Sequence, residues 1–329
     1  MNPVPSESEH RGTGRWLGLV AAVATSVALF AAPQNPPAAP TPPAEPSQSP
    51  APVPSPAAAP PEAITLVGAG DIANCLIAGG SGAIATARLL DQIPGTIITL
   101  GDHAYQSGTA EEFRDCYGPR WGRFKDRTRP SPGNHDYLTN NGQAYFDFFG
   151  DAAGPKGRGY YSYDLGPWHI ISMNSTVDAS GRSEQMKWLK DDLAAHHTTC
   201  MLAYWHIPVF SSGPHGQDLR EAARMLDVWH VLYENGVDVV INGHDHDYER
   251  FAPQNPDGKP DPKGIREFVV GTGGGGLYEF KRPKPNSEVR NNRSYGVIKF
   301  TLRASDYSWD YVPGAGEQFH DSGTAACTP

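Results

Sequence analysis

The fold is decided by two runs of sequence that end alike, Ile64-Thr-Leu-Val-Gly-Ala-Gly-Asp71 and Thr96-Ile-Ile-Thr-Leu-Gly-Asp102. Each is a short apolar, β-branched run that closes on Gly-Asp, which predicts a buried strand with a carboxylate at its C-terminal end. Between them, apolar residues recur at helical spacing over 84–93 and stop at Pro94, so we expect a helix there, capped by Ser81. Strand, helix and strand in this order predict a parallel pair joined by a right-handed crossover.

The rest of the chain continues the alternation of strands and helices. Aromatic, alternating segments at 160–163 and 168–173 predict a hairpin that turns at Gly166-Pro167. Amphipathic patterns predict helices over 183–195 and 218–235. Further strands are predicted at 200–205, 237–241, 268–270, 295–300 and 307–311. The region from about residue 62 to 329 therefore has the length and pattern of one α/β domain.

The charge of the chain argues against nucleic-acid binding. The formal net charge is −9, with 27 Lys and Arg against 36 Asp and Glu, and no run of basic residues is present. A duplex binder needs a basic surface to displace counterions from the phosphates. The hydrophobic content of 39% suits a globular domain.

Two segments precede this domain. Residues 1–32 carry two arginines and then an uncharged apolar run, which predicts an export signal; a retained membrane anchor is the alternative. Residues 33–61 are rich in Pro and Ala and predict a disordered linker. The folded domain is expected to span 62–329. We therefore expect an exported protein (periplasmic, secreted or cell-surface), with no stable membrane association unless the N-terminal segment is retained.

The four cysteines fit this expectation. An even number of cysteines in an exported chain suggests two disulfides, and three pairings are possible in principle. Cys75 and Cys116 each follow a motif at the end of one of the first two strands, and Cys327 could tie the C-terminal tail to the strand at Cys200. We favour Cys75–Cys116 and Cys200–Cys327.

Polar residues gather where the predicted strands end. In α/β sheets, ligands bind at the C-terminal edge of the strands. The candidates at strand ends are Asp71, Asp102, His206 and His244, and neighbouring loops add Tyr105, Asn134, His135 and His246. Oxygen and imidazole donors in this number suit two metal ions. If one Asp bridges, each metal receives four protein ligands and keeps room for water or substrate.

These segments resemble the calcineurin-like metallophosphoesterases, and within them the purple acid phosphatases. The matching motifs are Gly70-Asp71, Gly101-Asp102-His-Ala-Tyr105, Gly133-Asn134-His135-Asp136, Trp205-His206 and Gly243-His244-Asp-His246-Asp-Tyr248-Glu249-Arg250. The tyrosine three residues after the second aspartate is typical of the purple type. The resemblance implies a four-layer αββα sandwich, an α/β (α+β) fold with two mixed β-sheets flanked by helices.

The resemblance also assigns the ligands. Asp71, Tyr105 and His246 would hold a first metal, Fe(III). Asn134, His206 and His244 would hold a second, Fe(II), Zn or Mn, and Asp102 would bridge the two. A phenolate from Tyr105 is a hard anionic donor that favours ferric iron and would give a charge-transfer colour.

Three further residues are implied as catalytic: His135, Asp136 and His215. His135 would contact the phosphate and protonate the leaving oxygen, and Asp136, where many relatives carry glutamate, would orient it. His215 would be a second phosphate contact, although an exposed loop histidine is an equal alternative. The glycine run 271–276 lacks the lysine of a P-loop and is expected to let the backbone pass close beneath the metals.

The implied reaction is hydrolysis of a small-molecule phosphate monoester by water that the two cations activate. A phosphodiesterase or nucleotidase on the same metals is an alternative, because the loops that set specificity do not reveal the leaving group. A metal-stabilised binding module is a further alternative. The acid–base histidine argues against it, because a structural metal site is closed and needs no such group. The sequence does not identify a protein partner.

Overall fold

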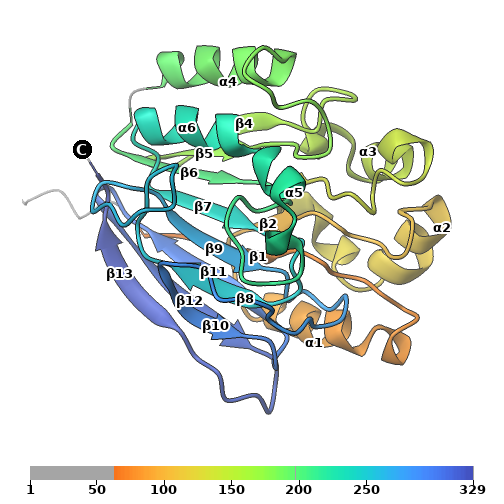
Figure 1. The fold of residues 1–329 in the computed structure, drawn as a ribbon. Coiled ribbons are helices and arrows are strands. Elements are labelled where there is room, and N and C mark those ends of the chain that lie inside the picture. Colours follow the sequence, from red (N-terminus) through yellow and green to blue (C-terminus); the bar gives the residue numbers. More distant parts are fainter. Residues whose placement is uncertain (1–62, 197, 329) are drawn as a thin grey trace, which may run out of the picture. The chain divides into compact units, whose positions relative to one another are not determined.

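Two mixed β-sheets lie face to face in the computed structural model, which describes residues 63–196 and 198–328 (Figure 1). Among these residues the first sheet has six strands in the order β13-β12-β11-β1-β2-β3. They are β1 (Ile64–Ala69), β2 (Thr96–Leu100), β3 (Thr128–Ser131), β11 (Gly296–Leu302), β12 (Asp306–Pro313) and β13 (Ser322–Ala326). Strands β1, β2 and β3 are parallel, as the strand–helix–strand pattern predicts, and β11, β12 and β13 are added antiparallel.

The second sheet has seven strands in the order β10-β8-β9-β7-β6-β5-β4 within the same described residues. They are β4 (Tyr161–Leu165), β5 (Trp168–Ser172), β6 (Cys200–Tyr204), β7 (Val239–Asn242), β8 (Tyr248–Phe251), β9 (Arg266–Val270) and β10 (Ser287–Asn291). Strands β5, β6, β7 and β9 are parallel, so their C-terminal ends share one edge. The predicted hairpin is β4 and β5, which pair antiparallel.

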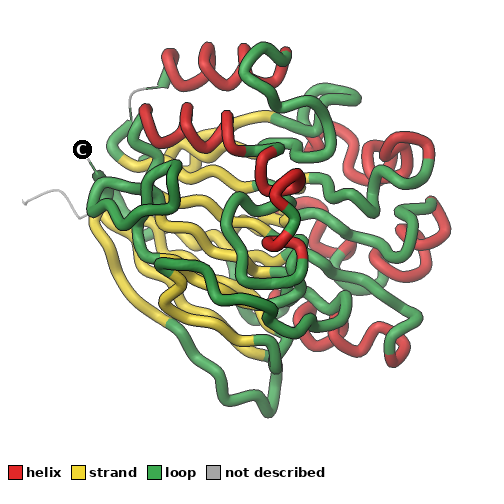
Figure 2. The backbone as a smooth tube through the Cα atoms, in the orientation of Figure 1, coloured by secondary structure: helices red, strands yellow, loops and turns green. Residues whose placement is uncertain are grey.

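Helices cover the outer faces of both sheets (Figures 1 and 2). Side chains of the second sheet alternate between two cores: Ile170, Leu202 and Ile241 pack toward the first sheet. Their neighbours Ile171, Ala203 and Val240 pack against α4 (Glu184–Ala195) and α6 (Leu226–Glu234). Helix α1 (Ser81–Leu90) packs on the first sheet. The four-layer αββα sandwich is therefore confirmed.

Some elements differ from the prediction. The expected helix over 218–235 is two helices, α5 (Leu219–Ala223) and α6, because Met225 leaves the helical conformation and enters the core. The N-cap of α1 is Gly80, so Ser81 is its first residue. Strand β3 contains Pro130, which removes one donor, and it is tolerated because β3 pairs with β2 alone at the sheet edge. Two short helices, α2 (Ala110–Glu112) and α3 (Gln143–Phe149), were also not predicted.

Both favoured disulfides are confirmed. Cys75–Cys116 joins the loops after β1 and β2, and Cys200–Cys327 ties the C-terminal segment to β6. The expected signal or anchor (1–32) and linker (33–61) lie outside the described residues. Within the part that is described, the structure contains no helix with the length and hydrophobicity needed to cross a bilayer.

Candidate metal centre

Four of the predicted ligands follow strands of the two sheets. Asp71 follows β1, Asp102 follows β2, His206 follows β6 and His244 follows β7. Three of them have a left-handed backbone, with φ of 60° at Asp71, 52° at Asp102 and 72° at His244. Residues other than glycine adopt this conformation at a cost, and such strain concentrates at functional sites. The strand ends are therefore shaped to aim these side chains at one point.

The first cluster forms around the phenol oxygen of Tyr105. This oxygen lies 2.9 Å from Oδ1 of Asp71 and 2.9 Å from Nε2 of His246. The same Nε2 lies 3.2 Å from Oδ1 of Asp71. The three donor atoms therefore form a compact triangle of two oxygens and one nitrogen.

The second cluster forms around Nε2 of His206. This nitrogen lies 2.9 Å from Oδ1 of Asn134 and 3.1 Å from Nδ1 of His244. The rings of His206 and His244 meet edge to face. Both imidazoles are buried.

Asp102 joins the two clusters. Its Oδ2 lies 3.0 Å from the phenol oxygen of Tyr105 and 3.4 Å from Nε2 of His206. Its Oδ1 accepts the backbone N–H of His135 at 2.8 Å. One carboxylate thus faces both donor groups, as a bridging ligand must.

The donor atoms fit metal ions in spacing and in protonation. Ligand atoms about 3 Å apart are what metal–ligand bonds near 2.1 Å at right angles require. Backbone carbonyls also hold the histidines: Nδ1 of His206 faces the oxygen of Leu100 at 2.7 Å, and Nδ1 of His246 faces that of Gly276 at 2.5 Å. A carbonyl only accepts, so each Nδ1 carries the proton and each Nε2 offers its lone pair to the site.

Glycines let the backbone approach the ligands. A Cβ on Gly133 would lie 2.1 Å from Oδ1 of Asp102, so no side chain fits there. The glycine run 271–276 passes directly behind Asp71, where the N–H of Gly275 donates to the backbone oxygen of Asp71. This is the close passage predicted for the run, and its last carbonyl also orients His246.

The electrostatics of the first cluster favour a cation. Burial alone would raise the pKa of Asp71, yet neighbouring His246 holds that pKa below its ordinary value. Burial, with the carboxylates of Asp102 and Asp71, raises the pKa of Tyr105 well above its ordinary value. Deprotonation of this phenol therefore needs a strong positive charge beside it, which a metal ion supplies.

His135 lies at the rim of the centre, with a partner other than the expected one. Its Nε2 is 3.9 Å from Oδ2 of Asp102, and its side chain is 28% exposed. Its Nδ1 faces the backbone oxygen of Gln106 at 2.6 Å. The carboxylate of Asp136, expected to orient His135, instead faces Nδ1 of His103 at 2.8 Å and accepts the N–H of Gly133. Because Asp136 is fully buried beneath the loop, it fixes the turn that carries His135.

His215 also reaches the centre. Its ring centroid lies 4.0 Å from that of His244. Its loop is held by Asp245, whose carboxylate accepts the N–H groups of His215 and Gly216 and the hydroxyl of Ser211.

The sequence analysis missed Glu221. This carboxylate, on α5, lies 3.1 Å from Nδ1 of His215 and 3.2 Å from Nε2 of His244. The hydrogen bond with His244 lowers the pKa of Glu221 to about 2. Because the other nitrogen of His244 faces His206, Glu221 orients a candidate ligand from behind. Its position on a short helix gave no sequence signal.

Comparisons with known proteins point to one family. The sequence matches the family model described as calcineurin-like phosphoesterase over residues 64–248, which include all seven candidate ligands. Purple acid phosphatase 15 of Arabidopsis thaliana is 31% identical over 222 residues, 57% of this chain and 41% of that protein. Purple acid phosphatase 21 of the same plant is 30% identical over 254 residues, 68% of this chain and 56% of that protein.

A solved structure shares the fold. That of purple acid phosphatase PPD1 from yellow lupin (Lupinus luteus) seeds aligns with a TM-score of 0.65 and 20% identity. The alignment covers 80% of this chain and 54% of that one. The chain thus spans about half the length of the relatives it resembles.

Proposed function

We propose, because this chain belongs to the calcineurin-like phosphoesterase family, that it hydrolyses phosphate monoesters on two metal ions as a purple-type acid phosphatase. The observation that carries the proposal is the position of Asp102. Its single carboxylate lies within 3.0 Å of the Tyr105 phenol and 3.4 Å of His206, between two sets of metal-binding atoms. A structural site for one ion would need neither the second set nor a shared ligand.

The two sets differ in chemistry, and we assign different metals to them. Asp71, Tyr105 and His246 supply two anionic oxygens and one imidazole, which suit Fe(III). Asn134, His206 and His244 supply a neutral amide oxygen and two imidazoles, which suit Fe(II), Zn or Mn. When bound, the two ions would draw in the phosphoryl oxygens and lower the pKa of water beside them.

We assign to His135 the role of donating a proton to the leaving oxygen. The carbonyl of Gln106 fixes Nδ1–H, so Nε2 of His135 is the nitrogen that turns toward the centre. Its partial exposure supports this role, because a substrate could reach it from solvent. Asp136 supports this loop through Gly133 and His103, so its role is to position His135 and not to contact substrate.

His215 is assigned as a further contact to the phosphate, because its ring lies against that of His244. A histidine here, carried on a loop that Asp245 anchors, can donate to a phosphoryl oxygen without binding metal. The carboxylate of Glu221 faces one ring nitrogen of His215 and one of His244, and it thereby fixes the orientation of both rings.

We assign the protein to an exported location. The two disulfides and the apolar segment within residues 1–32 support an oxidising compartment outside the cytoplasm. The partner expected there is a small phosphate ester, since the charge of −9 disfavours nucleic acid.

One experiment tests the proposal on the purified full-length chain. Metal analysis, a visible spectrum, and rates on p-nitrophenyl phosphate and bis-p-nitrophenyl phosphate are measured for the native chain and for Asp102→Asn. We expect two metals per chain, a visible band and faster monoester turnover, all lost together in the variant. Faster diester turnover would favour the phosphodiesterase alternative. Bound metal without any turnover would overturn the enzymatic assignment.

A further inference from the structure

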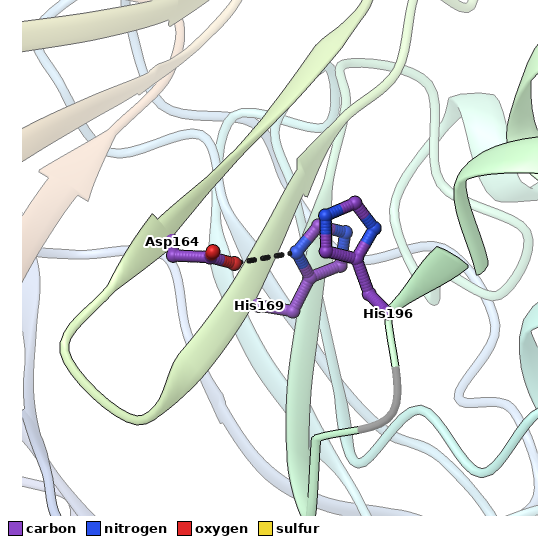
Figure 3. A group of neighbouring side chains, drawn as sticks. All are labelled: Asp164, His169 and His196. Carbon is purple, nitrogen blue, oxygen red and sulfur yellow. Dashed lines mark hydrogen bonds and ion pairs between the residues drawn. The ribbon is translucent and has the colours of Figure 1, made fainter. Parts of the chain in front are cut away.

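A second group of histidines and carboxylates lies away from the metal centre (Figure 3). His169 stands at the N-terminal end of β5, whereas the ligands of the centre follow the C-terminal ends of β6 and β7, which run parallel to β5. The group therefore occupies the opposite edge of the second sheet. One ligand atom from each of Asp164, His169 and His196 lies within 4.8 Å of the other two.

Asp192 fixes the ring nitrogens of both histidines. Its Oδ2 faces Nε2 of His169 at 2.8 Å, and its backbone oxygen faces Nδ1 of His196 at 2.8 Å. Both oxygens only accept, so these two nitrogens carry protons. Nε2 of His196 is therefore the nitrogen of that ring that can bind an ion. Nδ1 of His169 faces Oδ1 of Asp164 at 2.9 Å, and it can bind an ion that takes the place of the proton between them.

The two carboxylates of the group play unequal parts. The side chain of Asp192 is 7% exposed, and its Oδ1 also accepts the hydroxyl of Ser162 at 2.6 Å. Asp164 has a side chain 62% exposed, and its Oδ1 faces Nδ1 of His169 at 2.9 Å. In metal sites, a carboxylate commonly accepts the N–H of one ring nitrogen while the other nitrogen binds the ion, and Asp192 has the position of that carboxylate.

His196 is the third candidate ligand of this group. Its ring lies over that of His169, with centroids 3.9 Å apart and planes 16° apart (Figure 3). Two stacked rings cannot point at one ion, so binding needs the His196 ring to turn toward Asp164. The residue follows the end of α4 and its side chain is 34% exposed, which leaves the ring room to turn.

We propose that Asp164, His169 and His196 bind a Zn²⁺ ion, with Asp192 as the group that orients His169. Two imidazoles and one carboxylate with a water are a common tetrahedral zinc set. The bound ion would join the β4–β5 hairpin to the C-terminal end of α4. The site is independent of the metal centre and does not rest on the proposed phosphatase activity.

The test uses the full-length chain and Zn²⁺ alone, and it compares His196→Ala, Asp164→Asn and His230→Ala. His230 is an exposed histidine on α6 and serves as the control. Equilibrium dialysis against Zn²⁺ should show about one ion per chain fewer in the first two variants than in the native chain and the control. His169 is left unchanged because it is fully buried between two carboxylates and its loss could unfold the chain.

A thermal unfolding series gives a second readout. The rise in melting temperature on adding Zn²⁺ should be smaller in His196→Ala than in His230→Ala, because an ion that binds only the folded state stabilises it. Equal zinc content and equal thermal response in all four proteins would overturn the proposal and leave the group as an ion-pair network. If the native chain binds this zinc but shows no phosphatase activity, the result would contradict the proposed function and leave the zinc site standing.

Discussion

The phenol oxygen of Tyr105 lies 2.9 Å from Oδ1 of Asp71, although 34 positions separate the two residues in the sequence. They meet because β1 and β2 are parallel neighbours whose C-terminal ends lie at one edge. Both side chains are buried, so two acidic oxygens share a space without water. Either a proton or a cation must lie between them.

This contact predicts the spectrum of the iron-loaded protein. Tyr105→Phe should remove the visible band, because no phenolate remains to donate charge to ferric iron, while iron stays bound by the other ligands. The control is Tyr278→Phe, since Tyr278 stacks on His246 with ring centroids 4.0 Å apart but is not among the candidate ligands. The measurement is the absorption spectrum at equal iron content. A band that persists in Tyr105→Phe would refute the assignment of this residue.

Asp102 predicts the coupling of the two metal sites. Asp102→Asn should lower metal occupancy at both positions and abolish turnover, because a neutral amide cannot offset the charge of two cations. Metal analysis after dialysis measures this loss. The matched control is Asp310→Asn, an exposed position on β12, which should keep full occupancy and rate. Loss of only one metal would show that Asp102 serves one ion.

The clustering of the candidate ligands was predictable, because these residues stand near strand ends or in glycine-rich turns. An apolar run that ends in Gly-Asp predicts both where the strand ends and where its carboxylate lies, as at Asp71 and Asp102. Parallel pairing then brings the C-terminal ends of neighbouring strands to one edge.

Contacts between distant loops were not predictable. Asp136 follows His135 directly in the sequence, yet its carboxylate turns inward to His103, which lies in the loop after β2. Glu221 reaches His244 only because the helix breaks at Met225 and α5 takes its own direction. Local patterns specify which residues are polar, but packing decides which of them meet.

Glu221 predicts the affinity of the second metal. Glu221→Gln should weaken the metal held by His244 by about 10- to 100-fold, the usual effect of removing a carboxylate behind a metal-binding histidine. The first metal should be retained, because Glu221 contacts neither Tyr105 nor His246. Competition with a chelator measures both affinities. Glu234→Gln, at an exposed position on α6, is the control. Equal weakening of both metals would mean that the change disturbs the fold.

Asp238 predicts a pH-dependent stability unrelated to the metals. Burial raises its pKa from 3.8 to about 6, although it accepts the N–H groups of Met201 and Thr328. The folded state therefore binds this proton more tightly than the unfolded state. The stabilisation is complete below pH 3.8 and is lost as the pH rises through about 6.

Asp238→Asn removes this titration. Relative to the variant, the native chain should therefore lose about 2–3 kcal/mol of unfolding free energy between pH 3.5 and pH 7. Denaturant unfolding at several pH values measures the difference. Asp191→Asn, exposed on α4, should give a curve parallel to that of the native chain. Parallel curves for Asp238→Asn as well would show that Asp238 does not titrate in this range.

His135 predicts how the rate depends on the leaving group. If Nε2 of His135 protonates the leaving oxygen and binds no metal, His135→Ala should keep both metals and lose roughly 10²–10⁴-fold in rate on esters of weakly acidic alcohols. An ester of an acidic phenol needs less protonation, so its loss should be smaller. Rates on an alkyl phosphate and on p-nitrophenyl phosphate, with metal analysis, measure both effects. His320→Ala, at an exposed position, should change neither. Equal losses on both esters would mean that His135 only positions phosphate, and loss of a metal would make it a ligand.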